Sequence, residues 1–460
     1  MFAAIANTFS NCFKIPELKS RIIFTLLMLA LCRVIAFVPV PGLDASALNE
    51  WFKHNSGQMS GSVVGMYSLF TGGAMRKCAI GALGIMPYIT ASIIIQLLSA
   101  VLPGLSKLSR EEGGRAKIIQ FGRYLTVLLC LGHGTLMTLG WENPSSLFNG
   151  FVGHLVVPGQ NIWFYRIQTI LVLTTGTMLL MWIGEQITER GIGNGISLII
   201  TIGIIADLPM AGQALWEGFF PPEGVEAQYT IFHGIGLFLL LLAVVAGVIA
   251  VTQAQRKIPV QYAQRAVGRK VYAGSSSFMP LRVNYAGVMP IIFAQAILMF
   301  PSLILERLGA LTHVKLFTEM ATNLNRGHWL YYLLYTLMIL FFSYFWVATQ
   351  FNEIQISDDL KKYGGYIPGV RPGQATSDYL HRTMSRITLA GAIFLTLIAL
   401  IPQVMGQVFH INQYVSQFFG GTSMLITVGV LLDTMRQMET HLLMRHYDGF
   451  LKKGRLKGRF

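Results

Sequence analysis

Two pairs of isoleucines have a spacing that points to a shared task. Ile85 and Ile89 lie four residues apart, and Ile196 and Ile200 repeat the same interval. In a helix this spacing puts both side chains on one face, and β-branching keeps them stiff. Such pairs could line an apolar constriction. They could also simply pack against protein or lipid, which is the commoner role of an apolar residue in such a helix.

Groups that catalyse reactions are not evident. The sequence contains no Walker A motif, no His-Glu-x-x-His zinc signature, no Gly-x-Ser-x-Gly elbow and no Gly-x-Gly-Asp pair. The four cysteines lack metal or redox spacing and are predicted to be unpaired thiols: Cys12, Cys32, Cys78 and Cys130. We therefore expect no enzyme activity and no cofactor, so that any movement of a substrate is driven by a partner.

The isoleucine pairs lie within apolar runs that are long enough to cross a bilayer. Hydrophobic residues make up 53% of the 460 residues and charged residues only 12%, which indicates an integral membrane protein. Helical spans need about 20 apolar residues. Ten spans are predicted, the fifth of them short: Ile22–Val38, Ala79–Leu102, Ile118–Leu139, Ile162–Ile183, Gly195–Asp207, Ile231–Val251, Tyr285–Leu305, Trp329–Thr349, Ile387–Ile401 and Phe418–Leu432.

The basic residues predict the orientation of these spans. With a cytoplasmic N-terminus, most of the 35 Lys and Arg residues fall in loops and tails on the cytoplasmic side, as the positive-inside rule requires. Both termini are then cytoplasmic, and residues 1–21 show no cleavable signal peptide. The net charge of +14 is concentrated on a face that could meet anionic lipids, nucleic acid or an acidic protein.

Two loops on this face are long for simple connectors. In the loop at about 252–283, Ile258, Val260 and Tyr262 alternate, which predicts a protruding hairpin with basic flanks. Pro259 is expected to interrupt it. A docking surface and an ordinary solvated loop explain this pattern equally well. The second long loop covers about 350–386.

A glycine-rich stretch precedes the second span. Residues 61–77, GSVVGMYSLFTGGAMRK, have an apolar core that is too short to cross the bilayer. A re-entrant segment and an interfacial loop both fit. Pro87 lies at the start of the following helix, where its missing N–H is tolerated.

Five stretches together resemble a known family. In order and spacing, FTGGAMRKCAIGALGIMPYITASIIIQLL, GEQITERGIGNGISLII, PLRVNYAGVMPIIFAQAILMFP, YIPGVRPGQAT and FGGTSMLIT are similar to those of the SecY/Sec61-alpha family, the channel subunits of Sec protein translocases. The likeness runs from IPELKSR to the LKKGRLKG tail, and so covers almost the whole chain.

The resemblance implies an all-α polytopic membrane protein. Its ten transmembrane helices would form two pseudosymmetric, inverted five-helix halves around a central pore. Residues 1–21 and 435–460 would be cytoplasmic tails. The halves would cover 22–208, with a movable plug at about 61–75, and 209–434.

The resemblance also assigns roles to individual residues. The implied pore ring consists of Ile85, Ile89, Ile196, Ile200, Ile292 and Ile426, which would exclude water and ions by dewetting. Within the plug it singles out Met66, Leu69, Phe70, Gly72 and Gly73. A lateral gate between the second and seventh helices would carry Ser92, Gln96, Asn284 and Gln295, whose polar groups could hydrogen-bond across the interface. Contacts to the ATPase SecA or to ribosomal RNA would come from Arg256, Lys257, Arg265 and Arg371.

The function implied is a passive channel in the cell inner membrane. It would pass unfolded secretory preproteins, recognise their signal sequences and release hydrophobic segments sideways, as a heterotrimer with SecE and SecG and beside anionic lipids. Two other classes stay open. An ion-coupled transporter usually needs ionisable residues at membrane depth, and charges inside the spans are scarce: Arg33 lies well within the first span, and Arg166 and Glu185 lie near the ends of the fourth. An insertase without a through-pore would never pass soluble chains.

Overall fold

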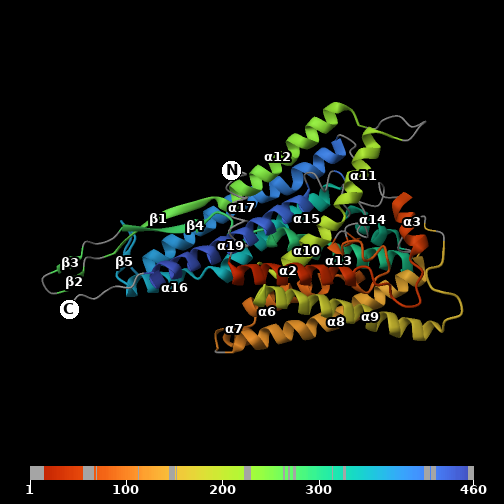
Figure 1. The fold of residues 1–460 in the computed structure, drawn as a ribbon, viewed down its shortest axis with the longest axis horizontal. Coiled ribbons are helices and arrows are strands. Elements are labelled where there is room, and N and C mark those ends of the chain that lie inside the picture. The colour runs from red at the N-terminus through yellow and green to blue at the C-terminus, as the bar shows by residue number, and fades with distance from the viewer. Residues whose placement is uncertain are drawn as a thin grey trace.

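A computed structural model of the chain describes residues 15–54, 67–68, 70–111, 113–144, 151, 153–221, 229–262, 265–267, 270–272, 276–312, 314–324, 328–408, 415 and 421–453. Helices form a bundle, and a β-hairpin extends from one end of it (Figure 1). Along one side of the bundle run α7 (Pro103–Arg110), α8 (Gly114–Glu142) and α9 (Ile162–Arg190). On the opposite side lies α12 (Ile231–Gln253).

Six further elements of the first half are described. They are α2 (Pro16–Ile35), α3 (Ser46–His54), the 3₁₀ turn η1 (Ile80–Leu83), α6 (Met86–Val101), α10 (Gly195–Ala206) and α11 (Leu208–Phe219). Proline sets several of these boundaries. Leu102 adopts an extended conformation between α6 and α7 because it precedes Pro103, and a residue before proline disfavours the helical region.

The second half combines helices with a three-stranded and a two-stranded sheet. Its elements are β1 (Gln255–Tyr262), β2 (Arg265–Val267), β3 (Lys270–Tyr272), β4 (Ser276–Arg282), α13 (Met289–Thr312), α14 (Lys315–Asn323), α15 (Trp329–Gln350), α16 (Glu353–Lys362), β5 (Gly365–Tyr366), α17 (Gln374–Val408) and α19 (Thr422–Lys453).

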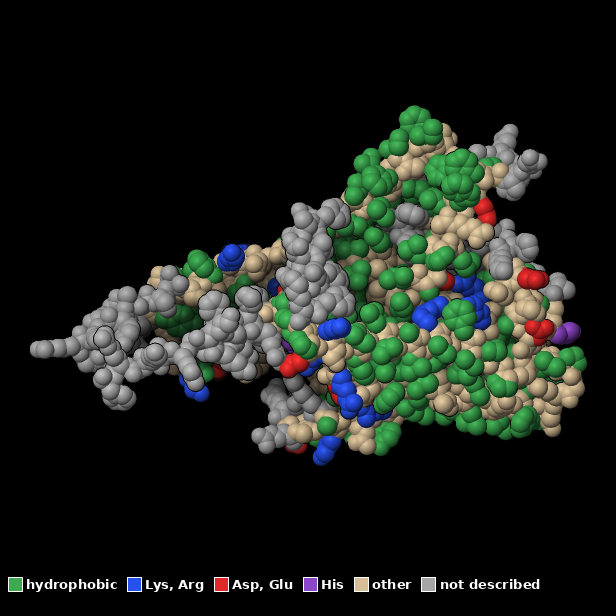
Figure 2. Space-filling model, viewed as in Figure 1, with side chains coloured by type: hydrophobic (Ala, Val, Ile, Leu, Met, Phe, Trp, Pro, Cys, Tyr) green, Lys and Arg blue, Asp and Glu red, His purple; other side chains and the backbone are tan. Residues whose placement is uncertain are grey.

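Seven helical stretches of the described chain are long and apolar enough to cross a membrane. They are Ile80–Val101, Ala116–Glu142, Ile162–Arg190, Gly195–Phe219, Ile231–Gln253, Trp329–Lys362 and Gln374–Gly406. The other three predicted spans fall on α2, α13 and α19. The chain is therefore a multi-pass membrane protein, and hydrophobic side chains cover most of the bundle face shown in Figure 2. The predicted short fifth span is longer than expected, because α11 continues directly from α10.

The two long loops of the second half form one packed unit. β1 pairs with β4 along the hairpin and with β5, so that Gln261 lies opposite Tyr366. Ile258 packs in one cluster with Leu380 of α17 and Phe351, which follows α15. Figure 1 shows this unit at the end of the molecule opposite to α3 and α14. The basic loop unit and the elements α3 and α14 therefore lie at opposite ends of the molecule.

The hairpin corrects one expectation. Pro259 does not interrupt it, because β1 continues through this residue and pairs it with Phe278. Among the described strands, β4 alone neighbours β1 at this point, since β5 pairs with Gln261 and Tyr262. The missing N–H can therefore face an open edge, where proline is tolerated in strands.

Ion pairs join α8 and α9 at both ends. The Arg123 guanidinium donates from Nε and Nη2 to the two carboxylate oxygens of Glu185, at 3.2 and 2.8 Å. Arg166 makes the same bidentate contact with Glu142, at 3.0 and 2.9 Å. Each pair gains geometric specificity from the matching fork of guanidinium and carboxylate.

Candidate functional site

The six predicted ring residues come from four different parts of the fold. Ile85 caps the start of α6 and Ile89 lies one turn into that helix, while Ile196 and Ile200 lie on α10. Ile292 and Ile426 come from α13 and α19. All except Ile196 are at most 3% exposed, and all six belong to or pack against one hydrophobic cluster. The structure thus gathers the six side chains in one core, and their role as a ring remains a prediction.

Local signals start the two helices that carry the isoleucine pairs. Gly84, at φ +58°, turns the chain from η1 into α6, and Pro87 occupies the first turn. Asn194 caps α10, because its Oδ1 accepts hydrogen bonds from the backbone N–H groups of Ile196 and Ser197, at 3.1 and 3.3 Å. Asparagine is among the preferred N-cap residues. Both helices therefore begin beside the isoleucines that they carry.

Three of the predicted plug residues are described, and they lie beside this core. Phe70, Gly72 and Gly73 are buried, and the two glycines adopt φ values of +62° and +78°. Such values favour glycine because a side chain would clash with the backbone. Met66 and Leu69 lie outside the described residues.

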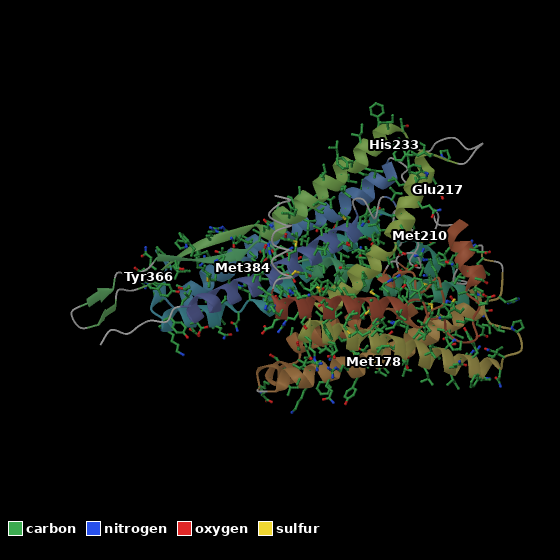
Figure 3. All side chains as sticks on the ribbon, viewed as in Figure 1. Met178, Met210, Glu217, His233, Tyr366 and Met384 are labelled. Carbon is green, nitrogen blue, oxygen red and sulfur yellow. The ribbon has the colours of Figure 1, made fainter. Side chains whose placement is uncertain are left out.

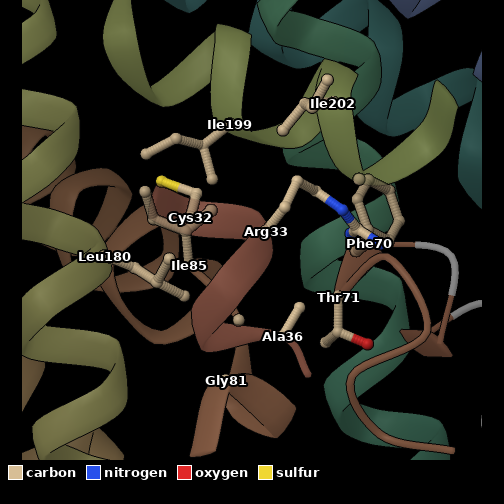
Figure 4. Close-up of a pocket in the computed structure, with 12 residues that line it drawn as sticks. Cys32, Arg33, Ala36, Phe70, Thr71, Gly81, Ile85, Leu180, Ile199 and Ile202 are labelled. Carbon is tan, nitrogen blue, oxygen red and sulfur yellow. The ribbon is translucent and has the colours of Figure 1, made fainter. Parts of the chain in front are cut away.

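A small cavity adjoins this segment and parts of the neighbouring helices. Its lining includes Phe70, Thr71, Ile85, Ile199 and Gly203. Figure 4 shows the Arg33 side chain reaching from α2 towards the segment that carries Phe70 and Thr71. Ile85 of the predicted ring and Phe70 of the predicted plug thus line the same cavity.

A buried ion pair at the end of the plug segment was not predicted. The Arg76 guanidinium donates to an Asp207 carboxylate oxygen, and both side chains are at most 6% exposed. Arg76 also lies 2.6 Å from the Met210 sulfur, and Arg33 donates to the Gly72 carbonyl at 3.1 Å. Burial and the nearby guanidinium groups of Arg33 and Arg76 lower the pKa of Lys77. The sequence predicted few charges inside the protein, so this compact cluster of Arg33, Arg76, Lys77 and Asp207 was missed.

The four predicted gate residues lie on or beside α6 and α13, which pack against each other. Their side-chain hydrogen bonds nevertheless go elsewhere. Gln96 donates to Ser92 of its own helix at 3.2 Å, and Asn284 donates to the Gly287 carbonyl at 2.8 Å. Gln295 is buried and donates to the Thr422 hydroxyl of α19 at 2.7 Å. These bonds do not cross between α6 and α13, so packing holds this part of the interface.

The predicted partner contacts lie on the packed loop unit. Arg256 and Lys257 are exposed on β1, and Arg371 is exposed in the turn between β5 and α17. The Arg371 carbonyl accepts a hydrogen bond from the Thr376 hydroxyl at 2.9 Å, which holds the backbone of this turn. The side chain of Arg265 lies outside the described part of the structure.

Comparison with known sequences decides the family. The sequence model of the SecY family matches residues 79–435. The chain belongs to the SecY family. It is 42% identical to the protein translocase subunit SecY of Thermotoga maritima over 98% of this chain and 99% of that protein. The protein of the same name from Escherichia coli strain K12 is also 42% identical, over 96% of each chain.

Solved structures share the fold of this SecY-family chain. One described as a protein-conducting channel has a TM-score of 0.59 at 19% identity, and covers 95% of this chain and 94% of its own. Sec61 in a canine ribosome–channel complex has a TM-score of 0.56 at 18% identity, covering the same shares of the two chains. The fold prediction, an all-α polytopic channel subunit, is therefore confirmed.

Proposed function

We propose that this chain is the pore-forming subunit of a protein translocase. It passes unfolded secretory polypeptides across the cytoplasmic membrane and releases hydrophobic segments sideways into lipid. The observation that best supports this proposal is that six isoleucines from four parts of the fold lie in or pack against one buried core, which also contains Phe70 and in which Ile85 lines the cavity beside it. Membership of the SecY family points to the same activity.

The ring would work by shape and hydration. Stiff, apolar side chains around a narrow passage keep it dry and so block ions, yet they can separate when a polypeptide enters. The segment around Gly72 and Gly73 would act as the plug and would leave its place during transport. None of these steps requires a reacting group, so the channel itself would be passive.

Energy would come from partners that bind the basic loops. Arg256, Lys257 and Arg371 are exposed on the loop unit, where guanidinium and ammonium groups can bind carboxylates of SecA or phosphates of ribosomal RNA. In this proposal SecE and SecG complete the heterotrimer. The loop unit and both termini face the cytoplasm. Anionic lipids contact the same basic face of the protein. The ribosome-bound Sec61 channel with this fold supports a ribosomal partner.

Sideways release would take place between α6 and α13. Gln96 donates to Ser92 within α6, and Gln295 of α13 donates to Thr422 of α19, so neither hydrogen bond crosses this interface. Separating the two helices would therefore break apolar contacts and leave the Gln295–Thr422 bond intact. A hydrophobic signal segment could then replace one apolar surface by another.

An ion-coupled transporter is the second candidate, because the structure adds one observation in its favour. The buried Arg76–Asp207 pair is an ionisable pair within the membrane protein's interior, and such groups often mark ion pathways. A transporter would carry ions and a small solute in the absence of any preprotein. Flux that depends on such a solute would therefore favour this second candidate.

A crosslinking experiment tests the channel directly. A photo-crosslinker is placed at Ile85 or Ile426 in proteoliposomes that hold the chain with SecE, SecA and a preprotein stalled midway. We expect ATP-dependent crosslinks from both positions. Ile339 of α15 is the matched control, because it is equally buried in the same cluster but does not belong to the six. Protease-protected preprotein without crosslinks at either position would place the route elsewhere.

A further inference from the structure

One face of α10 carries more than the two ring isoleucines. Ile196, Ile200, Gly203 and Asp207 are separated by four, three and four residues, which is the spacing of one helical face. Ile196 and Ile200 belong to the predicted ring. Gly203 and Asp207 lie beyond them towards α11, where the plug segment packs.

Gly203 lets the backbone of the plug segment approach α10 closely. A methyl group built on Gly203 would lie 3.3 Å from the Phe70 carbonyl oxygen and 3.4 Å from the Gly72 nitrogen. In the reverse direction, a methyl group on Gly72 would lie 2.8 Å from the Gly203 Cα. Two glycines therefore face each other. A methyl group on Gly72 would push the two backbones apart, whereas one on Gly203 would be a tight contact and only a larger side chain such as valine would force them apart.

Asp207 lies where α10 gives way to α11. Pro209 follows two residues later and has no N–H to continue the hydrogen-bond ladder of α10, so the regular helical hydrogen bonding is interrupted next to Asp207. The carboxylate lies at the N-terminus of α11, where negative charge is favourable. It is buried, binds Arg76, and also interacts electrostatically with Arg33 and Lys77.

Arg33 completes the arrangement from a third element. Its Nη1 donates to the Gly72 carbonyl at 3.1 Å, so α2 and α10 hold neighbouring parts of the same segment. The second carboxylate oxygen of Asp207 has no hydrogen-bond partner among the described residues. Because buried polar groups normally have partners, the contact with Arg76 satisfies the Asp207 carboxylate only in part.

We propose that Gly203 and Asp207 form a seat on the pore-facing side of α10, and that the Arg76–Asp207 ion pair fastens the Phe70–Arg76 segment to it in the resting channel. We call the two residues the α10 seat. They are positioning residues, because they act through the plug segment and touch no substrate. The inference rests on the proposed channel function and adds residues that set its resting state.

The balance of charge predicts unequal effects for the two partners. Three cations, Arg33, Arg76 and Lys77, surround the one carboxylate of Asp207. Removing one member of a buried pair leaves the other uncompensated. Asp207→Asn leaves three cations without an opposing charge, whereas Arg76→Gln leaves Asp207 with two cations. Asp207→Asn should therefore release the segment more readily than Arg76→Gln.

The test measures chloride leak through the resting complex. Vesicles of one lipid composition contain the full heterotrimer and a chloride-quenched dye, and no preprotein. We expect Asp207→Asn to raise the leak about tenfold or more, since loss of one partner of a buried pair exceeds the free energy of a tenfold change. Gly203→Val should raise it as well. The exchanged pair Arg76→Asp with Asp207→Arg should return the leak towards the wild-type rate.

Two matched controls separate the seat from general damage. Gly212→Val places the same side chain in α11, where a methyl group would meet nothing within 4 Å. Glu217→Gln removes a carboxylate from the same helix, farther from α10 than Met210 (Figure 3). Both controls should leak like the wild type.

Three results would overturn the seat. The first is a wild-type complex that translocates a preprotein while the chloride leak of the Asp207→Asn and Gly203→Val variants is no higher than that of the controls. The second is an exchanged pair that leaks as much as Asp207→Asn. The third is equal leak in both controls and both seat variants. A wild-type complex that translocates no preprotein would count against the proposed channel function. The chloride leak of the Asp207→Asn variant and of the exchanged pair would still test whether the Arg76–Asp207 ion pair holds the segment.

Discussion

Shortening the ring side chains should open the resting channel to ions. Ile292 and Ile426 are at most 1% exposed, so each Ile→Ala change removes buried methyl groups and leaves a cavity. Such changes cost about 2–5 kcal/mol of the free energy of unfolding. Ile339→Ala should cost a similar amount, because this side chain is equally buried in the same cluster. Equal destabilisation with unequal ion leak would separate the ring from ordinary packing.

The assay combines two measurements on each purified complex. Loss of soluble complex on heating reports stability, and chloride-driven dye quenching in vesicles reports the resting leak. We expect all three variants to melt earlier and only Ile292→Ala and Ile426→Ala to leak above the wild-type rate. The reasoning would be refuted if Ile339→Ala leaked as much as the other two, since the leak would then follow from loosened packing anywhere in the core.

Three further outcomes follow from single contacts. Arg371→Ala should reduce SecA-driven translocation and leave the melting temperature unchanged, because the side chain is exposed, and Lys362→Ala is the matched control in the ATPase-coupled assay. Burial raises the pKa of the Cys78 thiol to about 12. In a variant that keeps this cysteine alone, maleimide labelling at pH 7 should therefore be roughly a thousandfold slower than for a free thiol, and the labelling rate should rise when a preprotein is stalled in the channel. Fast labelling of the resting channel would contradict this expectation. Arg166→Gln should cost about 1 kcal/mol or less, an effect that shrinks in high salt, because the pair with Glu142 is partly exposed.

Much of the fold could be predicted because its signals are local. Long apolar runs predicted the spans, and the alternation of Ile258 and Val260 predicted a strand whose alternate side chains are indeed buried. The expected interruption at Pro259 was wrong, because an open strand edge is a property of the assembled sheet. The continuation of α10 into α11 was missed for a similar reason, since the charge of Asp207 interrupts the hydropathy but not the path of the helix.

The site was predicted only where a pattern or a family motif marked it. The pairs on α6 and α10 were visible from their spacing, whereas Ile292 and Ile426 followed from the resemblance to the SecY family. The Arg76–Asp207 pair joins residues 131 positions apart, and no sequence pattern relates them. One signal was nevertheless present, because Asp207 is in phase with Ile196 and Ile200 on the same helical face.

The ion pairs at the two ends of α8 and α9 also set a length. On each helix the two charged residues lie about 19 positions apart, which corresponds to about 28 Å along the axis. A bilayer's hydrocarbon core is about 30 Å thick. The separation of the two ion pairs on α8 and α9 therefore matches the thickness of the hydrocarbon core, and we expect one pair near each headgroup layer. In a thinner bilayer the two helices would have to tilt, and the inclination of this half of the protein would then vary with the lipids around it.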